Sequence, residues 1–198
     1  MPQDEKLREK LITYLQDMHA VENHLVEVLG KQVQETSDAP LFQMKIQEHL
    51  EQTKQHRTRL EACLSRYSTK PSGGKSALTN ILGSLQGVLS GTRPDALAMS
   101  VRDDYVSENF EIASYIMLIA TAQAFGDQET VNACQLNLHD EVITAKWLEQ
   151  HVGQAALLSL QKDGIPIAAD TIQQEQTQVN GVLAGFWQEA EQMAASGN

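Results

Sequence analysis

One stretch, from Val101 to Ala122, constrains the fold most, because it places carboxylates on an apolar helical face. It contains neither Gly nor Pro. At about 100° per residue, its apolar side chains fall on one stripe. The stripe comprises Val101, Tyr105, Ile112, Tyr115 and Ile119. Glu108 lies at its centre and Glu111 at its edge. Carboxylates buried on such a face cost free energy unless a metal ion, a basic side chain or a proton compensates their charge.

Composition narrows the class of protein. The chain has 198 residues and a formal net charge of −11, which argues against nucleic acid and anionic membrane surfaces as partners. No apolar run is long enough to span a bilayer, so we expect no membrane association. The N-terminal residues do not resemble a secretory signal. Two cysteines, Cys63 and Cys134, form no disulfide framework and favour a reducing, cytoplasmic compartment.

Helical periodicity predicts an all-α fold. Long helices are expected over residues 4–30, 40–67, 95–125 and 128–162, with a short crossover helix over 77–90 and a further helix over 167–194. We expect Gly30 to end the first helix, Ser37 or Asp38 to cap the second, and Asp127 to cap the fourth. Four long helices with a long middle connection predict a ferritin-like four-helix bundle. We therefore expect two domains, a bundle over 1–160 and a C-terminal helical extension over 161–198.

Polar residues recur on the inward faces of all four long helices. Ferritin-like bundles hold two metal ions with a Glu from each of two helices and a Glu-x-x-His motif from each of the others. The predicted metal ligands here are Glu22, His49, His56, Glu108, Glu111 and Glu141. Carboxylates and imidazoles suit iron, manganese or zinc, so the set predicts a dinuclear centre.

A second interpretation needs no metal. The inward acids could be protonated, or paired with Arg57, Arg102 or Lys146. The chain would then be a non-catalytic helical dimer with a vestigial site, and its extra C-terminal helix would pack outside the bundle or across the dimer interface. No catalytic residue is identified by either interpretation.

Other polar candidates have structural explanations. One of three tyrosines could support the site from behind its ligands; these are Tyr14, Tyr105 and Tyr115. The remaining histidines are expected at the surface or at helix ends; these are His19, His24, His139 and His151. We expect both cysteines to be buried as small apolar groups.

Three phrases resemble the YciE/YciF stress-protein family of the ferritin-like superfamily. They are Leu15–Leu25 around Glu22, His49–Glu61, and Glu108-Asn-Phe-Glu-Ile-Ala-Ser-Tyr115. The resemblance covers about residues 5–155, and implies a ferritin-like bundle, usually a homodimer, linked to bacterial stress responses.

The family pattern is not followed at every position. Glu22, Glu108 and Glu111 stand where the family has glutamates, and His56 where many members have His or Gln. Gln52 stands where the family commonly has Glu, and neither the second nor the fourth long helix carries a Glu-x-x-His motif.

Overall fold

The computed structural model describes residues 3–69 and 96–196 and contains five α-helices in that part of the chain. They are α1 (Gln3–Glu35), α2 (Pro40–Arg66), α4 (Ala96–Phe125), α5 (Gln128–Lys162) and α6 (Ala169–Ser196). The all-α prediction is confirmed, as is the extra C-terminal helix. The crossover helix predicted over 77–90 lies outside the described residues.

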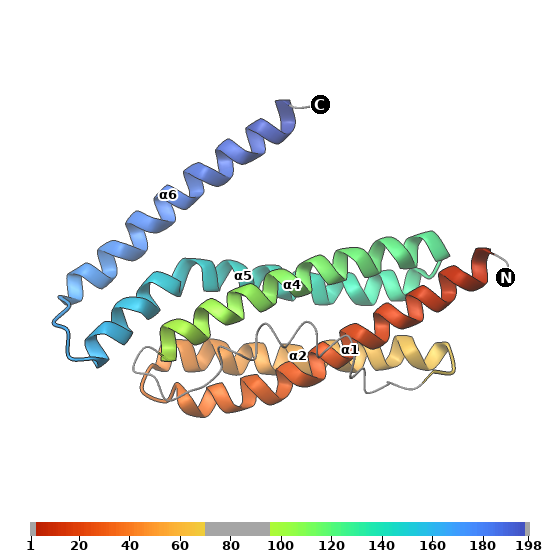
Figure 1. Cartoon of the computed structure of the whole chain (residues 1–198), viewed down its shortest axis with the longest axis horizontal. Helices are drawn as coiled ribbons and strands as arrows, with labels where there is room; N and C mark the ends of the chain where they lie inside the picture. Colours follow the sequence, from red (N-terminus) through yellow and green to blue (C-terminus); the bar gives the residue numbers. More distant parts are fainter. Residues whose placement is uncertain (1–2, 70–95, 197–198) are drawn as a thin grey trace. The chain divides into compact units, whose positions relative to one another are not determined.

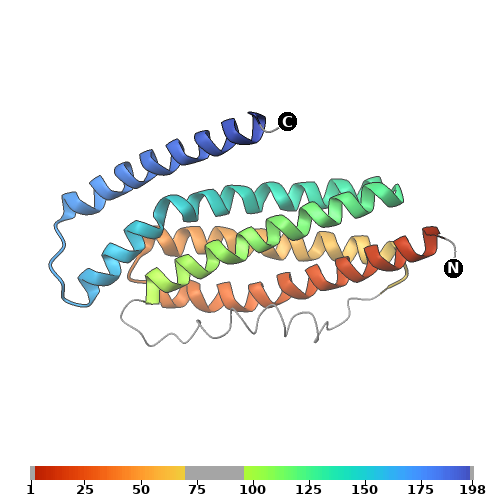
Figure 2. The same cartoon turned by 45° about the horizontal axis from the view of Figure 1, so that its top comes forward.

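The chain forms two compact units. The first contains residues 1–88 and 106–145, and the second contains 89–105 and 146–198. The predicted division at residue 160 stays a prediction. Within the first unit, α1 and α2 form an antiparallel hairpin, and the later part of α4 forms a second hairpin with the earlier part of α5 (Figures 1 and 2).

The first unit is a four-helix bundle with one apolar core. Each of its four helices contributes buried side chains, as the period of 3.6 residues requires. The core includes Leu11, Leu15 and Leu29 from α1, Leu60 and Leu64 from α2, Leu118 and Ala122 from α4, and Val131 and Cys134 from α5. Cys63 and Cys134 are both free and buried, as predicted.

Two of the predicted helix-end signals are wrong. Helix α1 passes through Gly30 to Glu35, because Gly30 adopts ordinary helical geometry there and Gln32 and Thr36 continue the buried face. The N-cap of α2 is Ala39, without a side-chain hydrogen bond, rather than Ser37 or Asp38. Pro40 then occupies the first turn, where its missing N–H has no intrahelical partner to lose.

The turn between α4 and α5 matches the sequence prediction. Gly126 adopts a φ of +82°, which favours glycine. Asp127 Oδ1 then accepts a hydrogen bond from the backbone N–H of Thr130 at 3.1 Å. The same carboxylate accepts hydrogen bonds from the Arg66 guanidinium at 2.6 Å and the Tyr67 hydroxyl at 2.5 Å. This one side chain therefore caps α5 and ties it to the end of α2.

Replacing Asp127 with alanine should lower the free energy of unfolding by about 1–2 kcal/mol, because the cap and both cross-links are lost. Burial raises the pKa of Asp127, but hydrogen bonds from Thr130 and Tyr67 and the charge of Arg66 outweigh it and lower the pKa below 3.8. This stabilisation is therefore present above pH 3.8 and is lost as the pH falls through the lowered value. Urea unfolding at pH 7 and pH 3 measures both effects. Equal stability of wild type and variant at pH 7 would contradict this account.

The second unit contains α6 and the neighbouring part of α5. Trp187 Nε1 donates to Glu149 Oε1 at 2.6 Å, and Lys146 donates to the other oxygen of that carboxylate at 2.5 Å. Trp147 stacks on His151 with ring centroids 3.9 Å apart. Gly164, at a φ of +80°, lies in the predicted break between α5 and α6.

Candidate metal centre

All six predicted ligands belong to the first unit and are buried. Their exposed fractions are Glu22 0%, His49 4%, His56 0%, Glu108 1%, Glu111 0% and Glu141 0%. The helical period explains this placement, because His49 and His56 are two turns apart on α2 and Glu108 and Glu111 are one turn apart on α4. Their role as metal ligands stays a prediction.

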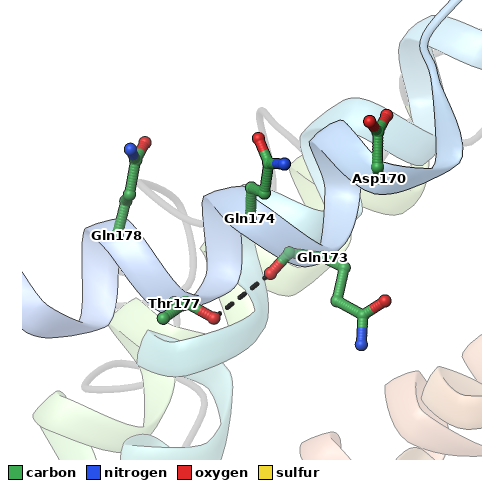
Figure 3. A pocket seen from close by; sticks show the side chains of 5 residues that line it. All are labelled: Asp170, Gln173, Gln174, Thr177 and Gln178. Carbon is green, nitrogen blue, oxygen red and sulfur yellow. Dashed lines mark hydrogen bonds between the residues drawn. The ribbon is translucent and has the colours of Figure 1, made fainter.

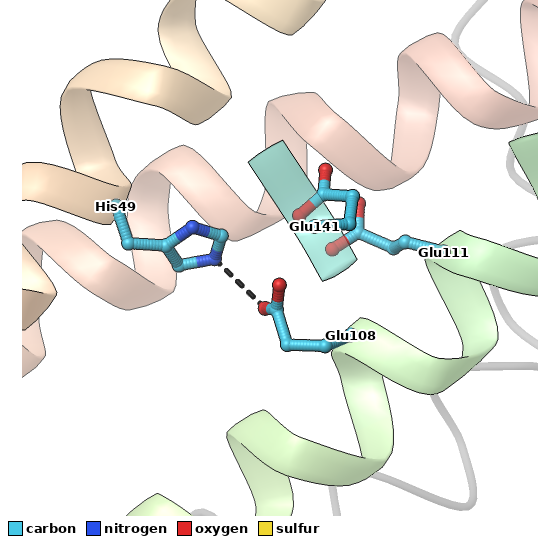
Figure 4. A group of neighbouring side chains, drawn as sticks. All are labelled: His49, Glu108, Glu111 and Glu141. Atoms are coloured by element: carbon cyan, nitrogen blue, oxygen red, sulfur yellow. Dashed lines mark ion pairs between the residues drawn. The ribbon is translucent and has the colours of Figure 1, made fainter. Parts of the chain in front are cut away.

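The six side chains form two groups that share one carboxylate. The first group contains His49, Glu108, Glu111 and Glu141; the second contains Glu22, His56 and Glu141. Within each group, one ligand atom of every residue lies within 4.8 Å of the others. Figure 4 shows His49 approaching from α2 and the acids of the first group facing it. Glu141 is therefore the residue able to bridge two ions.

Histidines, rather than Arg or Lys, lie beside these acids. His49 Nε2 lies 2.8 Å from Glu108 Oε1. His56 Nδ1 lies 2.8 Å from Glu141 Oε1 and 3.6 Å from Glu22 Oε1. This corrects the alternative in which Arg57, Arg102 or Lys146 would pair with the acids.

The three basic residues named for that role bind other partners. Arg57 donates to Asn23, Arg102 to Asp103, and Lys146 to Glu149. None of these partners is one of the six candidate ligands. Among the described residues, the imidazoles of His49 and His56 form the ion pairs of the centre.

Glu111 is the least compensated acid of the centre. Neither carboxylate oxygen accepts a hydrogen bond from any residue that the structure describes. Burial raises its pKa well above 4.5, and the charges of Glu141, Glu22 and Glu108 raise it further. A buried carboxylate in this position is stabilised by a proton or by a cation.

His56 carries a positive charge between two acids. Burial alone lowers its pKa, but the close contacts with Glu141 and Glu22 and the charges of these two acids raise it to about 10. Burial raises the pKa of Glu141, yet its close contact with His56 and the charges of both histidines lower it overall. Burial raises the pKa of Glu22, and this outweighs the opposing effect of His56.

Further polar residues form hydrogen bonds with a ligand of the second group or with each other. The Tyr115 hydroxyl donates to Glu22 Oε1 and accepts a hydrogen bond from Asn137 Nδ2 at 2.9 Å. Tyr115, one of the three tyrosines considered, thus supports a predicted ligand. Sequence reasoning missed Asn137, although it precedes Glu141 by four residues and so lies on the same face of α5. It also missed Asp140, which contacts His56.

One of the expected surface histidines is not at the surface. His19 is 8% exposed, and its Nε2 lies 3.0 Å from Glu61 Oε1. It belongs to neither of the two groups. His139, in contrast, is exposed as predicted.

The donor set suits a metal pair. Each group supplies one imidazole and at least two carboxylates, and this chemistry matches iron, manganese or zinc. The chain lacks Glu-x-x-His motifs, but the spacing of His49 and His56 provides one imidazole per group from α2 alone. Gln52 contributes no carboxylate, so Glu141 must serve both groups.

A hollow on α6 offers a weaker alternative site. Asp170, Gln173, Gln174, Thr177 and Gln178 line it (Figure 3). All five come from one helix, and only one is charged at neutral pH. It combines neither the burial nor the converging ligands of the centre in the bundle, and we assign it no function.

The fold and site together define an all-α, ferritin-like bundle with a buried carboxylate–histidine cluster. The chain belongs to the DUF892 family, described as a domain of unknown function, whose model matches residues 6–160. Solved structures agree and confirm the predicted YciE/YciF resemblance. A protein from Xanthomonas campestris pv. campestris is 26% identical to this chain with a TM-score of 0.68. The match covers 80% of this chain and 99% of the Xanthomonas protein.

Two further solved structures share the fold. The Escherichia coli stress protein YciF is 21% identical to this chain with a TM-score of 0.65. The match covers 78% of this chain and 98% of YciF. YcfI, a putative structural protein from Rhodopseudomonas palustris, is 24% identical with a TM-score of 0.63. That match covers 72% of this chain and 92% of YcfI. Among the described residues, no helix is both long and apolar enough to cross a membrane.

Proposed function

We propose that this chain is a ferritin-like bacterial stress-response protein that binds two metal ions in its bundle core. His49, Glu108 and Glu111 would hold one ion, Glu22 and His56 would hold the other, and Glu141 would serve both groups. The similarity to a named stress protein supports the cellular role. The two groups that share Glu141 support the dinuclear centre.

The Glu111 carboxylate is the observation that carries this proposal. It is fully buried, faces three other acids, and accepts no hydrogen bond from the described residues. Leaving a buried charged group without compensation costs several kcal/mol. A divalent cation in the first group would compensate the charges of Glu111, Glu108 and Glu141 together.

The bound metal determines what chemistry the centre supplies: iron or manganese would bring redox reactivity and zinc Lewis acidity. The chain's own residues bind and orient. His49 and His56 approach from the same helix, and Glu141 lies between the groups. Tyr115 and Asn137 hold Glu22 in place. The apolar side chains of the bundle exclude water around these ligands.

Metal content tests the proposal. The protein is stripped with a chelator, reloaded separately with Fe(II), Mn(II) and Zn(II), and analysed by mass spectrometry. We expect about two ions per chain for at least one metal. Values near zero for all three would overturn the proposal.

The double variant Glu108→Ala, Glu111→Ala should remain helical and lose the ion of the first group. Glu48 and Glu51 on α2 have the same three-residue spacing and are exposed, with side-chain exposed fractions of 57% and 55%. Their double alanine variant is the matched control and should keep wild-type metal content. Equal metal content in both double variants would refute the assignment of Glu108 and Glu111.

One observation favours the alternative of a metal-free helical homodimer. The pairs His49–Glu108 and His56–Glu141 already compensate part of the acidic charge. In that case the metal site is vestigial, and the chain is a non-catalytic homodimer that acts as an interaction or structural protein. Light scattering of the stripped protein measures the dimer, and the reloading experiment distinguishes the two functions.

A further inference from the structure

The ring nitrogen of His56 that faces away from the predicted ligands lies beside a third carboxylate, that of Asp140. We propose that Asp140 is a positioning residue, which fixes Nδ1 of His56 as the metal-binding atom of the second group. This inference rests on the proposed metal centre and deepens it. It concerns a residue that sequence reasoning overlooked.

The geometry around the imidazole carries the first step. His56 Nε2 lies 3.1 Å from Asp140 Oδ2, and His56 Nδ1 lies 2.8 Å from Glu141 Oε1. Asp140 and Glu141 are successive residues of α5, so their side chains leave the helix about 100° apart. They therefore reach the ring of His56 at its two different nitrogens.

The chemistry of these contacts assigns the two nitrogens different tasks. An ionised carboxylate only accepts hydrogen bonds, so the nitrogen facing Asp140 carries the proton. The other nitrogen, Nδ1, faces Glu141 and Glu22 and is the one free to bind a metal once its proton is displaced. Metal-binding histidines commonly donate their second N–H to a carboxylate in this way, which orients the ring.

Arg59 on α2 links Asp140 to the rest of the second group. Its Nη1 lies 3.7 Å from Asp140 Oδ2 and donates to Asn137 Oδ1 at 2.8 Å. Asn137 in turn donates to Tyr115, which donates to Glu22. The Arg59 guanidinium thus contacts Asp140, which orients His56, and Asn137, which is linked through Tyr115 to Glu22.

The network also reaches the edge of the bundle. Side-chain exposed fractions are 28% for Arg59 and 23% for Asp140, whereas His56 is fully buried. His139 Nδ1 is a further contact of Asp140, at 3.5 Å. Asp140 can therefore be altered without opening a large cavity in the core, which makes it a clean test position.

The test uses the full chain, with Zn(II) as the probe. Affinities are measured by chelator competition for wild type, Asp140→Ala and Asp140→Asn, with Glu129→Gln as the control that removes an exposed acid of α5. We expect Asp140→Ala to weaken one of two bound ions by about 10–100-fold and leave the other unchanged. Asp140→Asn keeps an acceptor oxygen and should lose less.

A second readout follows the ring itself. Long-range proton–nitrogen NMR of the imidazoles should show His56 protonated at Nε2 in zinc-loaded wild type, and a changed tautomer in Asp140→Ala. Circular dichroism checks that each variant is folded, and Asp140→Asn remains as the test if the alanine variant is not. Two ions bound with wild-type affinity and an unchanged tautomer in a folded variant would overturn this inference alone. A wild-type chain that binds no ion would overturn the proposed function, and this inference with it.

Discussion

Replacing His56 with alanine is expected to lower the free energy of unfolding of the metal-free protein by about 3–5 kcal/mol. The imidazole is fully buried and lies within 3.6 Å of carboxylate oxygens of Glu22, Asp140 and Glu141. Its removal leaves these acids without their shared cation. Breaking a buried ion pair from one side is costly because the remaining charge stays desolvated.

The pH dependence of this effect follows from the pKa of His56. Its value in the folded protein is about 10, above the ordinary 6.5, so folding favours the charged imidazole. The stabilisation is complete below pH 6.5 and is lost as the pH rises through about 10. The difference between wild type and His56→Ala should therefore shrink between pH 8 and pH 10.

Urea unfolding in the presence of chelator measures the difference. His139→Ala removes an imidazole with a side-chain exposed fraction of 71% and should change stability by no more than about 0.5 kcal/mol. If His56→Ala matches His139→Ala at neutral pH, then Glu22 and Glu141 do not depend on the His56 charge. Reloading with Zn(II) should also show the loss of one ion in His56→Ala.

Helical periodicity was sufficient to find the inward polar set. Glu108 lies on the apolar stripe of its helix. In the other three helices, Glu22, His56 and Glu141 likewise share the helical period of the apolar side chains, which places them on the inner faces. Burial follows from such a pattern because an amphipathic helix must cover its apolar face. The turn at Gly126 and Asp127 was equally predictable, since glycine and a capping acid are local signals.

Contacts between helices were not predictable in the same way. Asp140 lies about 100° from Glu141 on α5, away from the stripe, and contacts His56 only because α2 packs beside it. His19 was expected at the surface, yet Glu61 on α2 covers it. Gly30 suggested a helix end, but the buried Gln32 and Thr36 show that the helical face continues. Each error concerns a position whose environment depends on packing against a neighbouring helix.

Replacing Glu111 with glutamine is expected to raise the stability of the metal-free protein by about 1–3 kcal/mol, the usual cost of a buried polar group without a partner. Glutamine keeps the shape of the side chain, carries no charge, and can donate to neighbouring carboxylates. The same change removes a predicted ligand, so Zn(II) should stabilise the variant much less than wild type. The variant should thus be more stable than wild type without metal and should gain less stability from Zn(II). A buried acid that binds no metal would show only the first effect.

The raised pKa of Glu111 makes the predicted stability difference depend on pH. Its value is raised above 4.5 in the folded protein, so the folded state holds a proton that the unfolded state has released. Metal-free wild type should therefore lose stability as the pH rises above 4.5, and Glu111→Gln should remove much of that loss. Glu108→Gln is the matched control one turn away on α4. Glu108 has His49 2.8 Å from its carboxylate, so losing its charge should not stabilise the protein. If Glu111→Gln lowers stability in chelator at pH 5 and pH 8 alike, then the Glu111 carboxylate is compensated within the folded chain, and its burial no longer supports a metal ion in the first group.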